Sequence, residues 1–312
     1  MEGQEDFIDV PEDIRNYVEE GNFRFHAYQN ASYAFPNDDT AQSVEDERYV
    51  LGIILCEDRL HLAPVASELS KPGARVLDLG TGTGLWAMDM GDHYPHAEII
   101  GVDISPIQPT LVPENVMFLV ADMEQDFDGE DESYDFIHAR HTLECVVDPA
   151  GLLSKIYRLL KPGGYVEFHG NDHIPQVDDD GTLPPNTSYA VRELTQLVAE
   201  GVKRYSKTEY DIIAQAGPLV AAAGFESVTS EMRKLPLGLW PQDLRMHTCG
   251  FHALSSFMRG MRGLCARTLG PEGLGWTAPQ IEAFLTTVRR DAVDPRFHAW
   301  FPYHVVYARK PL

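Results

Sequence analysis

One glycine-rich stretch constrains the fold more than any other part of the chain: residues 74–87 have the sequence ARVLDLGTGTGLWA. Its apolar start, with Asp78 near the end, is typical of a strand buried inside a parallel sheet. Gly80, Gly82 and Gly84 follow at alternate positions, and a helix is expected to begin near Leu85. Glycine suits such a turn because it adopts positive φ and because a side chain would collide with a ligand lying across it. The stretch therefore predicts a nucleotide-binding turn.

This turn is compatible with two kinds of cofactor. Residues 82–87 match the Gly-x-Gly-x-x-Ala form of the dinucleotide fingerprint, so NAD(P) is one candidate. Asp78 favours the other candidate, S-adenosylmethionine (SAM), because a carboxylate inside the turn repels a pyrophosphate and attracts an ammonium or a sulfonium. The residues of this stretch that we predict to contact the cofactor are Asp78, Gly80, Thr81, Gly82 and Gly84.

Two more apolar runs along the chain end in an acidic residue. The first ends at Asp103, about 20 positions past the glycines, where a carboxylate binds a ribose diol in nucleotide-binding folds. The second ends at Asp122, which is predicted to accept a hydrogen bond from the adenine amine while Ile104 and Met123 sandwich the ring. A single acid at a strand end is usually a helix cap, but three acids after successive strands predict one shared cofactor site.

Three motifs in the chain resemble those of class I SAM-dependent methyltransferases: Gly80–Ala87, Gly101–Pro109 and Leu160–Glu167. Two upstream segments, Tyr33–Asp39 and Asp46–Arg48, resemble more narrowly the LaeA-like branch that is found in fungal secondary metabolism. The likeness to these methyltransferases spans residues 28–168 and does not specify a substrate.

The resemblance implies SAM as cofactor and an α/β fold, a Rossmann-like, doubly wound, mostly parallel sheet of seven strands. It also implies that the last strand, Tyr303–Arg309, inserts antiparallel between the fifth and the sixth. We expect Arg140 to contact the methionine part of SAM through its backbone. Tyr33 and Arg48 lie in the upstream segment, which we expect to close over the methionine end of SAM. An ordinary helical appendage that covers the sheet edge is the alternative for this segment.

The chain is predicted to divide into five parts. Residues 1–73 form an N-terminal helical arm, or lid, and residues 74–170 form the SAM-binding Rossmann-like core. Residues 171–236 complete that core with helices and the sixth strand, residues 237–299 form a helical insertion for the substrate, and residues 300–312 hold the terminal strand. Within the arm, residues Arg48 to Leu69 carry apolar side chains at helical spacing, which predicts helices.

Composition narrows the partners and the compartment. With 25 basic and 48 acidic residues, the formal charge is -23, so we expect repulsion from nucleic acid and from anionic membrane surfaces. The 4 cysteines have no paired spacing, and neither a signal peptide nor a membrane-spanning apolar run is visible. These features predict reduced thiols and a cytoplasmic protein. The sequence leaves the oligomeric state open.

Three histidines follow strand ends, where a substrate would meet the methyl group. His141 follows the predicted fourth strand, and His169 and His173 follow the fifth, so one of them is predicted to deprotonate or orient the acceptor. A metal is not expected. Four potential metal ligands share one segment, His247, Cys249, His252 and Cys265, but helical spacing does not bring them together.

Four functions fit these observations. The first is a SAM-dependent methyltransferase that acts on N or O of a small molecule, a fungal secondary metabolite in view of the resemblance. The second is a regulatory methyltransferase of the LaeA-like kind that modifies a protein or itself. A SAM-fold protein that guides another reaction and an NAD(P)-dependent oxidoreductase are the third and fourth.

Overall fold

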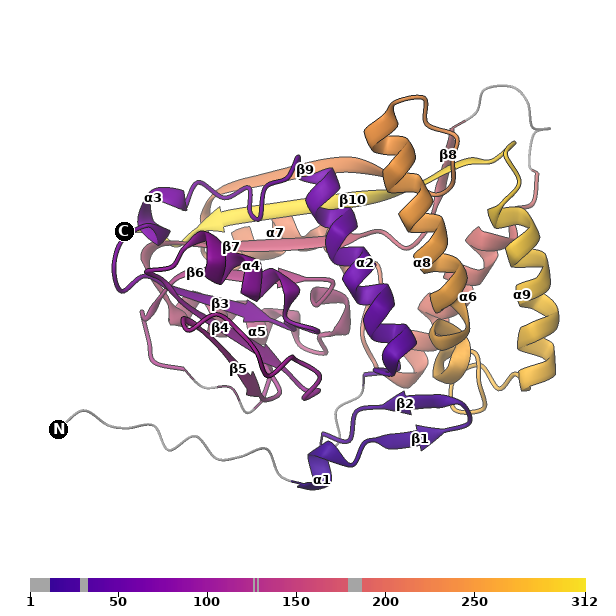
Figure 1. The fold of residues 1–312 in the computed structure, drawn as a ribbon, viewed down its shortest axis with the longest axis horizontal. Helices are drawn as coiled ribbons and strands as arrows, with labels where there is room; N and C mark the ends of the chain where they lie inside the picture. The colour runs from indigo at the N-terminus through magenta and orange to yellow at the C-terminus, as the bar shows by residue number, and fades with distance from the viewer. Residues whose placement is uncertain (1–11, 29–32, 126, 128, 179–186) are drawn as a thin grey trace.

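The computed structural model describes residues 12–28, 33–125, 127, 129–178 and 187–312. At its centre lies a mixed sheet, seen on the left of Figure 1, whose first five strands are parallel. These strands are β3 (Arg75–Leu79), β4 (Glu98–Asp103), β5 (Val116–Val120), β6 (Tyr134–Arg140) and β7 (Leu160–Asn171). Their order in the sheet is β5-β4-β3-β6-β7, so the chain winds outward in both directions from β3.

The C-terminal strand, β10 (His298–Arg309), lies antiparallel between β7 and β9 (Glu226–Pro236). This placement confirms the expected insertion of the last strand, and the α/β fold class is confirmed with it. A short strand, β8 (Gln176–Asp178), was not predicted and makes the sheet eight-stranded. It pairs with Trp300 and the two residues before it, a part of β10 that extends beyond the end of β7.

Each face of the sheet is covered by its own helices. Along β3, Leu77 and Leu79 point to the face covered by α5 (Pro149–Leu159) and α7 (Ala216–Ala222). Val76 points to the opposite face, where it packs with α3 (Ala66–Leu69) and α4 (Leu85–His93). Because side chains alternate along a strand, Asp78 shares the face of Val76 and lies under α4.

A second group of helices lies beside the sheet, on the right of Figure 1. It consists of α2 (Asp39–Leu55), α6 (Ala190–Tyr205), α8 (Leu244–Thr268) and α9 (Ala278–Ala292), which share one hydrophobic cluster with β9 and β10. Helix α2 runs between the sheet and α8, and Arg259 on α8 forms an ion pair with Glu47 on α2 at 2.7 Å. The predicted insertion, residues 237–299, is helical as expected, and its helices α8 and α9 belong to this layer. The described residues also include two short 3-10 helices, η1 (Leu143–Cys145) and η2 (Ile212–Gln215).

The N-terminal arm differs from its prediction. It contains a short helix, α1 (Glu12–Arg15), and a hairpin of β1 (Val18–Glu20) and β2 (Phe23–Phe25), neither of which was predicted. The helical pattern expected from Arg48 to Leu69 has other bounds: α2 begins at Asp39 and ends at Leu55, and α3 covers only Ala66–Leu69. The side chain of Asp38 caps its start by accepting from two backbone N–H groups, and left-handed residues just past its end break the helix. Among the described residues, none of the helices combines the length and the apolar character needed to cross a membrane.

Candidate active site

The glycine turn has the conformation that the sequence predicts. Gly80, Gly82 and Gly84 have φ values of +67°, +58° and +83°, and α4 begins at Leu85. A Cβ atom at Gly80 would lie 2.5 Å from Oγ1 of Thr142, whereas one at Gly82 would meet no atom of the described residues within 4 Å. Gly80 is therefore fixed by packing as well as by its φ angle, and Gly82 faces open space.

Two acidic side chains hold this turn in place. At the end of β4, Asp103 accepts from the backbone N–H of Gly82 at 2.9 Å and from that of Ser105 at 2.8 Å. Asp78 accepts from Oγ1 of Thr81 at 2.6 Å and lies 2.7 Å from Nδ1 of His138. Burial raises the pKa of Asp78 to about 7 and that of Asp103 to about 6. A cationic ligand at this turn would therefore stabilise both ionised carboxylates.

Two hollows meet beside the turn. The smaller, with a volume of about 60 Å³, is bounded by the glycine turn, α2 and the end of β6. The larger, about 1150 Å³, lies among the hairpin, α2, α6 and α8. Three residues line both hollows: Glu45 and Arg48 on α2, and His141 after β6. The two hollows therefore adjoin at these three side chains.

Helix α2 and its flanks are bonded to the turn and to the loop after β4. Thr83 Oγ1 donates to Asp46 on α2 at 2.7 Å, and Asn37 Nδ2 donates to Ser105 Oγ at 3.2 Å. From the loop after β4, Gln108 Nε2 also bonds the glycine turn, donating to the carbonyl of Gly82 at 2.7 Å. The smaller hollow, about 60 Å³, is well below the ~300 Å³ of a small ligand pocket. Entry of a nucleotide-sized ligand therefore requires these contacts to open.

A cation faces the smaller hollow. The guanidinium of Arg140 lies 5.2 Å from the centre of the Tyr49 ring, and its buried Nε has no hydrogen-bond partner among the described residues. The backbone carbonyl of Arg140, by contrast, already accepts from Oγ1 of Thr142 at 2.9 Å. The side chain of Arg140 is thus the group that is available to a ligand carboxylate.

Comparison with known proteins identifies the chain. Residues 54–211 match the family described as "Methyltransferase domain". Methyltransferase pytC of Aspergillus terreus is 37% identical over 96% of this chain and 89% of its own length. The chain belongs to the methyltransferase family. It is a SAM-dependent enzyme, and this assignment decides between the two cofactors that the glycine motif left open.

Other relatives of this methyltransferase are regulators. Secondary metabolism regulator LAE1 of Cochliobolus heterostrophus is 31% identical, over 97% of this chain and 98% of that protein. Secondary metabolism regulator laeA of Monascus pilosus is 28% identical, over 97% of this chain and 80% of that protein. These relatives confirm the resemblance to the LaeA-like branch.

The residues around the turn fit SAM. Gly82 leaves room for the nucleoside, the half-buried carboxylate of Asp103 can accept from the ribose hydroxyls, and the carboxylate of Asp78 suits the sulfonium. The guanidinium of Arg140, whose Nε has no partner among the described residues, can pair with the carboxylate of that cofactor. The residues predicted to bind adenine do not form a pocket with the turn. Asp122 lines neither hollow and accepts from the backbone N–H of Glu124 at 2.8 Å. Ile104 and Met123 are half-buried and line neither hollow.

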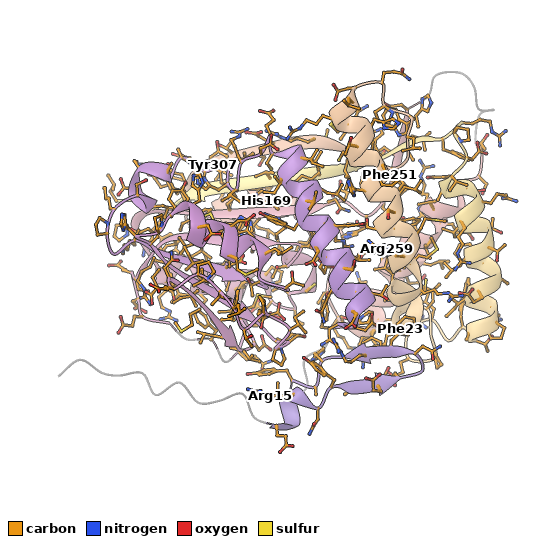
Figure 2. The ribbon with its side chains drawn as sticks, in the orientation of Figure 1. Arg15, Phe23, His169, Phe251, Arg259 and Tyr307 are labelled. Carbon is orange, nitrogen blue, oxygen red and sulfur yellow. The ribbon has the colours of Figure 1, made fainter. Side chains whose placement is uncertain are left out.

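The structure separates the three candidate histidines of the methyltransferase. His169 is 2% exposed and lines neither hollow, because its ring lies between Glu167 at 2.6 Å and the Tyr303 hydroxyl at 3.0 Å. Figure 2 shows it among the strands of the sheet, away from the hairpin that carries Phe23. His173 lines only the larger hollow, where it stacks on Tyr210. Only His141 lies at the junction of the hollows.

The two residues predicted from the arm also differ in position. Arg48 lines both hollows and forms an ion pair with Glu45 at 2.8 Å. Tyr33 lines only the larger hollow, where its ring packs edge-on against Phe35. Sequence reasoning missed Glu45, Tyr49 and Glu144, because nothing in their local pattern distinguishes them from other residues of a short helix or helical turn. No group of three potential metal ligands occurs in the described part of the chain.

Proposed function

We propose that this methyltransferase transfers the methyl group of SAM to N or O of a small molecule, a fungal secondary metabolite. The observation that carries the proposal is the hollow of about 1150 Å³ that meets the glycine-turn hollow at Glu45, Arg48 and His141. Its volume is slightly above the usual range for small-molecule pockets, about 300–1,000 Å³, so it can hold a large metabolite. The 37% identity to methyltransferase pytC, over 96% of this chain, supports the reaction type.

Each residue predicted to contact the cofactor has its own role. Asp103 takes the ribose hydroxyls, since each of its oxygens keeps a lone pair beyond its backbone bond. Asp78 supplies negative potential behind Thr81, and Arg140 binds the methionine carboxylate. Asp122, Ile104 and Met123 are proposed for adenine, after the loop that carries Gln108 moves aside.

Bound SAM supplies an electrophilic methyl group on a sulfonium. The chain has to place an acceptor atom in line with it, exclude water and remove a proton where the acceptor carries one. Arg48 and Glu45 form the wall between the two sites, and we propose that α2 closes over both. We further propose a cytoplasmic enzyme with no nucleic-acid partner, in accord with the formal charge of -23 and with four free cysteines.

The test uses SAM with a labelled methyl group and a metabolite extract from a fungal strain that lacks the gene. The purified enzyme is incubated with both, and label is counted in organic-soluble molecules and in precipitated protein. Asp103→Ala serves as the matched control. We expect label in organic-soluble molecules with the parent enzyme only. Label confined to protein would instead support a regulatory methyltransferase, the second candidate, which the likeness to LAE1 favours.

A further inference from the structure

A histidine and a glutamate lie together where the two hollows meet, a combination that can accept a proton. His141 and Glu144 both line the larger hollow, and His141 also lines the smaller one. Nδ1 of His141 lies 3.3 Å from Oε1 of Glu144. The carboxylate is 5% exposed, and its second oxygen, Oε2, has no hydrogen-bond partner among the described residues.

The backbone around this pair is held firmly. His141 has a φ of +50°, an unusual value for a residue with a side chain, and its N–H donates to the carbonyl of His169 at 2.8 Å. Thr142 Oγ1 donates to the carbonyl of Leu79 at 3.0 Å, which ties the segment to β3. The following turn, η1, carries Glu144 back toward the ring. A strained backbone conformation that several hydrogen bonds hold in place is typical of functional sites.

The pair has a defined protonation. Burial lowers the pKa of His141, so its ring is neutral near pH 7. Although burial would raise the pKa of Glu144, the hydrogen bond with His141 leaves it below the usual range. An ionised carboxylate accepts and cannot donate, so it selects the tautomer with the proton on Nδ1. No described residue bonds the other ring nitrogen, Nε2, which remains a proton acceptor.

Other charged and titratable groups face the pair from several elements. Glu45 and Arg48 on α2 lie close enough to influence the pKa of His141, and they are ion-paired with each other. The ring of Tyr303 on β10 lies 6.2 Å from the His141 ring. His173 and Tyr210 interact electrostatically with Glu144 from the other side.

The wall of the larger hollow indicates the kind of acceptor. Its described arginines are all engaged: Arg24 with Asn37, Arg48 with Glu45, Arg259 with Glu47 and Arg262 with Glu282. The remaining lining combines apolar and aromatic residues, including Phe257, Trp276 and Phe301, with acidic residues such as Glu19 and Asp39. A carboxylate or phosphate on the acceptor would therefore lose its hydration without gaining an ion pair.

We propose, on the basis of the proposed function, that the acceptor is a large, mainly apolar molecule without a carboxylate or phosphate, methylated on a hydroxyl group, with His141 as its base and Glu144 as the residue that positions His141. The acceptor oxygen forms a bond to the methyl carbon as the carbon–sulfur bond breaks, and that bonding pair stays on sulfur. The hydroxyl proton passes to Nε2 of His141 and later leaves to water. A hydroxyl is favoured because a neutral alcohol or phenol attacks poorly until a base takes its proton, whereas a neutral amine attacks with its own lone pair. A protonated amine would also need the base, and its N-methyl product distinguishes it.

The first test needs no acceptor. Nitrogen-15 NMR of the full chain with labelled histidine reports the tautomer and the pKa of His141, with His141→Gln to assign its signals. We expect the proton on Nδ1 in the parent. In Glu144→Gln, which keeps the shape and removes the charge, we expect the pKa of His141 to fall by about 1. A proton on Nε2 in the parent, or an unchanged pKa in Glu144→Gln, overturns the role of Glu144.

The second test follows methyl transfer to the active fraction of the metabolite extract. We expect kcat to fall about 10²- to 10⁴-fold in His141→Ala, and to fall in Glu144→Gln with partial recovery in Glu144→Asp, while the KM for SAM stays within about twofold. Unchanged unfolding temperatures and S-adenosylhomocysteine affinities establish that the variants fold. An unchanged kcat and pH profile in Glu144→Gln overturns its positioning role and leaves the proposed function intact.

The product identifies the acceptor class. SAM with a carbon-13 methyl group gives a product whose carbon spectrum distinguishes O-methyl from N-methyl and C-methyl. An O-methyl product supports the inference, and an N-methyl or C-methyl product overturns it while still supporting small-molecule methylation. If the parent enzyme labels no small molecule, the proposed function fails and the acceptor class fails with it.

Discussion

Asp103 is the residue on which the cofactor prediction depends most directly. It is anchored to Gly82 and Ser105 by backbone bonds, so its carboxylate is oriented before any ligand arrives. We expect Asp103→Ala to weaken SAM binding by about 1.5–3 kcal/mol, the range for hydrogen bonds to a charged group. Calorimetry measures the affinity, and Glu272→Ala, an exposed acid, is the control. Equal affinities in the parent and Asp103→Ala would show that another residue binds the ribose.

Asp78 links cofactor recognition to stability. Its folded-state pKa of about 7 lies above the value of about 3.9 for an unfolded chain. Between these two pH values the unfolded state releases the proton first, so Asp78 makes the free energy of unfolding decrease as pH rises from about 4 to 7. We expect Asp78→Asn to lose this part of the pH dependence. Urea unfolding of both proteins at several pH values measures it, and parallel curves would contradict the prediction.

Some residues of the candidate site could be predicted from the sequence, and others could not. The glycine turn and Asp103 were predictable because strand, turn and acid are local patterns with a fixed spacing. The sequence proposed three histidines with equal standing, since each follows a strand end. His141 differs from the other two in its partner Glu144 and in its place beside α2. Its proximity to α2 was not predictable, because the two are about a hundred residues apart along the chain.

At the scale of elements, the sequence predicted the parallel strands and the antiparallel β10 well, because each strand is a compact apolar run. The arm was less predictable. Apolar spacing continued past Leu55, but left-handed residues at Glu57 and Asp58 end α2 and no propensity rule forbids a helix there. The hairpin of β1 and β2 is short, and its side chains pack against α8 through Arg267, whose guanidinium lies 3.6 Å from the centre of the Phe25 ring.

The arm is the element that we expect to respond to the cofactor. Because Asp46 and Asn37 bind the turn and the β4 loop, ligand binding beneath α2 should restrain the arm. We expect trypsin to cut after Arg24 and Arg48 more slowly when S-adenosylhomocysteine is present. Cutting after Lys207, an exposed residue outside both hollows, is the internal control. Equal rates at the arm with and without the ligand would show that it is no lid.

At the scale of the whole molecule, the formal charge of -23 dominates. Like charges repel in the compact state, and salt screens them over about 10 Å at 0.1 M. We expect the unfolding temperature at pH 7 to rise as sodium chloride increases from about 0.01 to 0.15 M. Differential scanning calorimetry measures this, and a falling unfolding temperature would mean that the protein's ion pairs outweigh the general repulsion.

Helix α2 carries two of the three residues that the hollows share, and this imposes an order on the catalytic cycle. We proposed that α2 closes over both sites; lifting it to admit SAM also removes a wall from the acceptor site, so we expect that site to be complete only after α2 has returned. The acceptor then enters last, and its methylated form leaves before S-adenosylhomocysteine does. The enzyme's steady-state kinetics should accordingly be ordered, with S-adenosylhomocysteine competing against SAM and the methylated product competing against neither substrate.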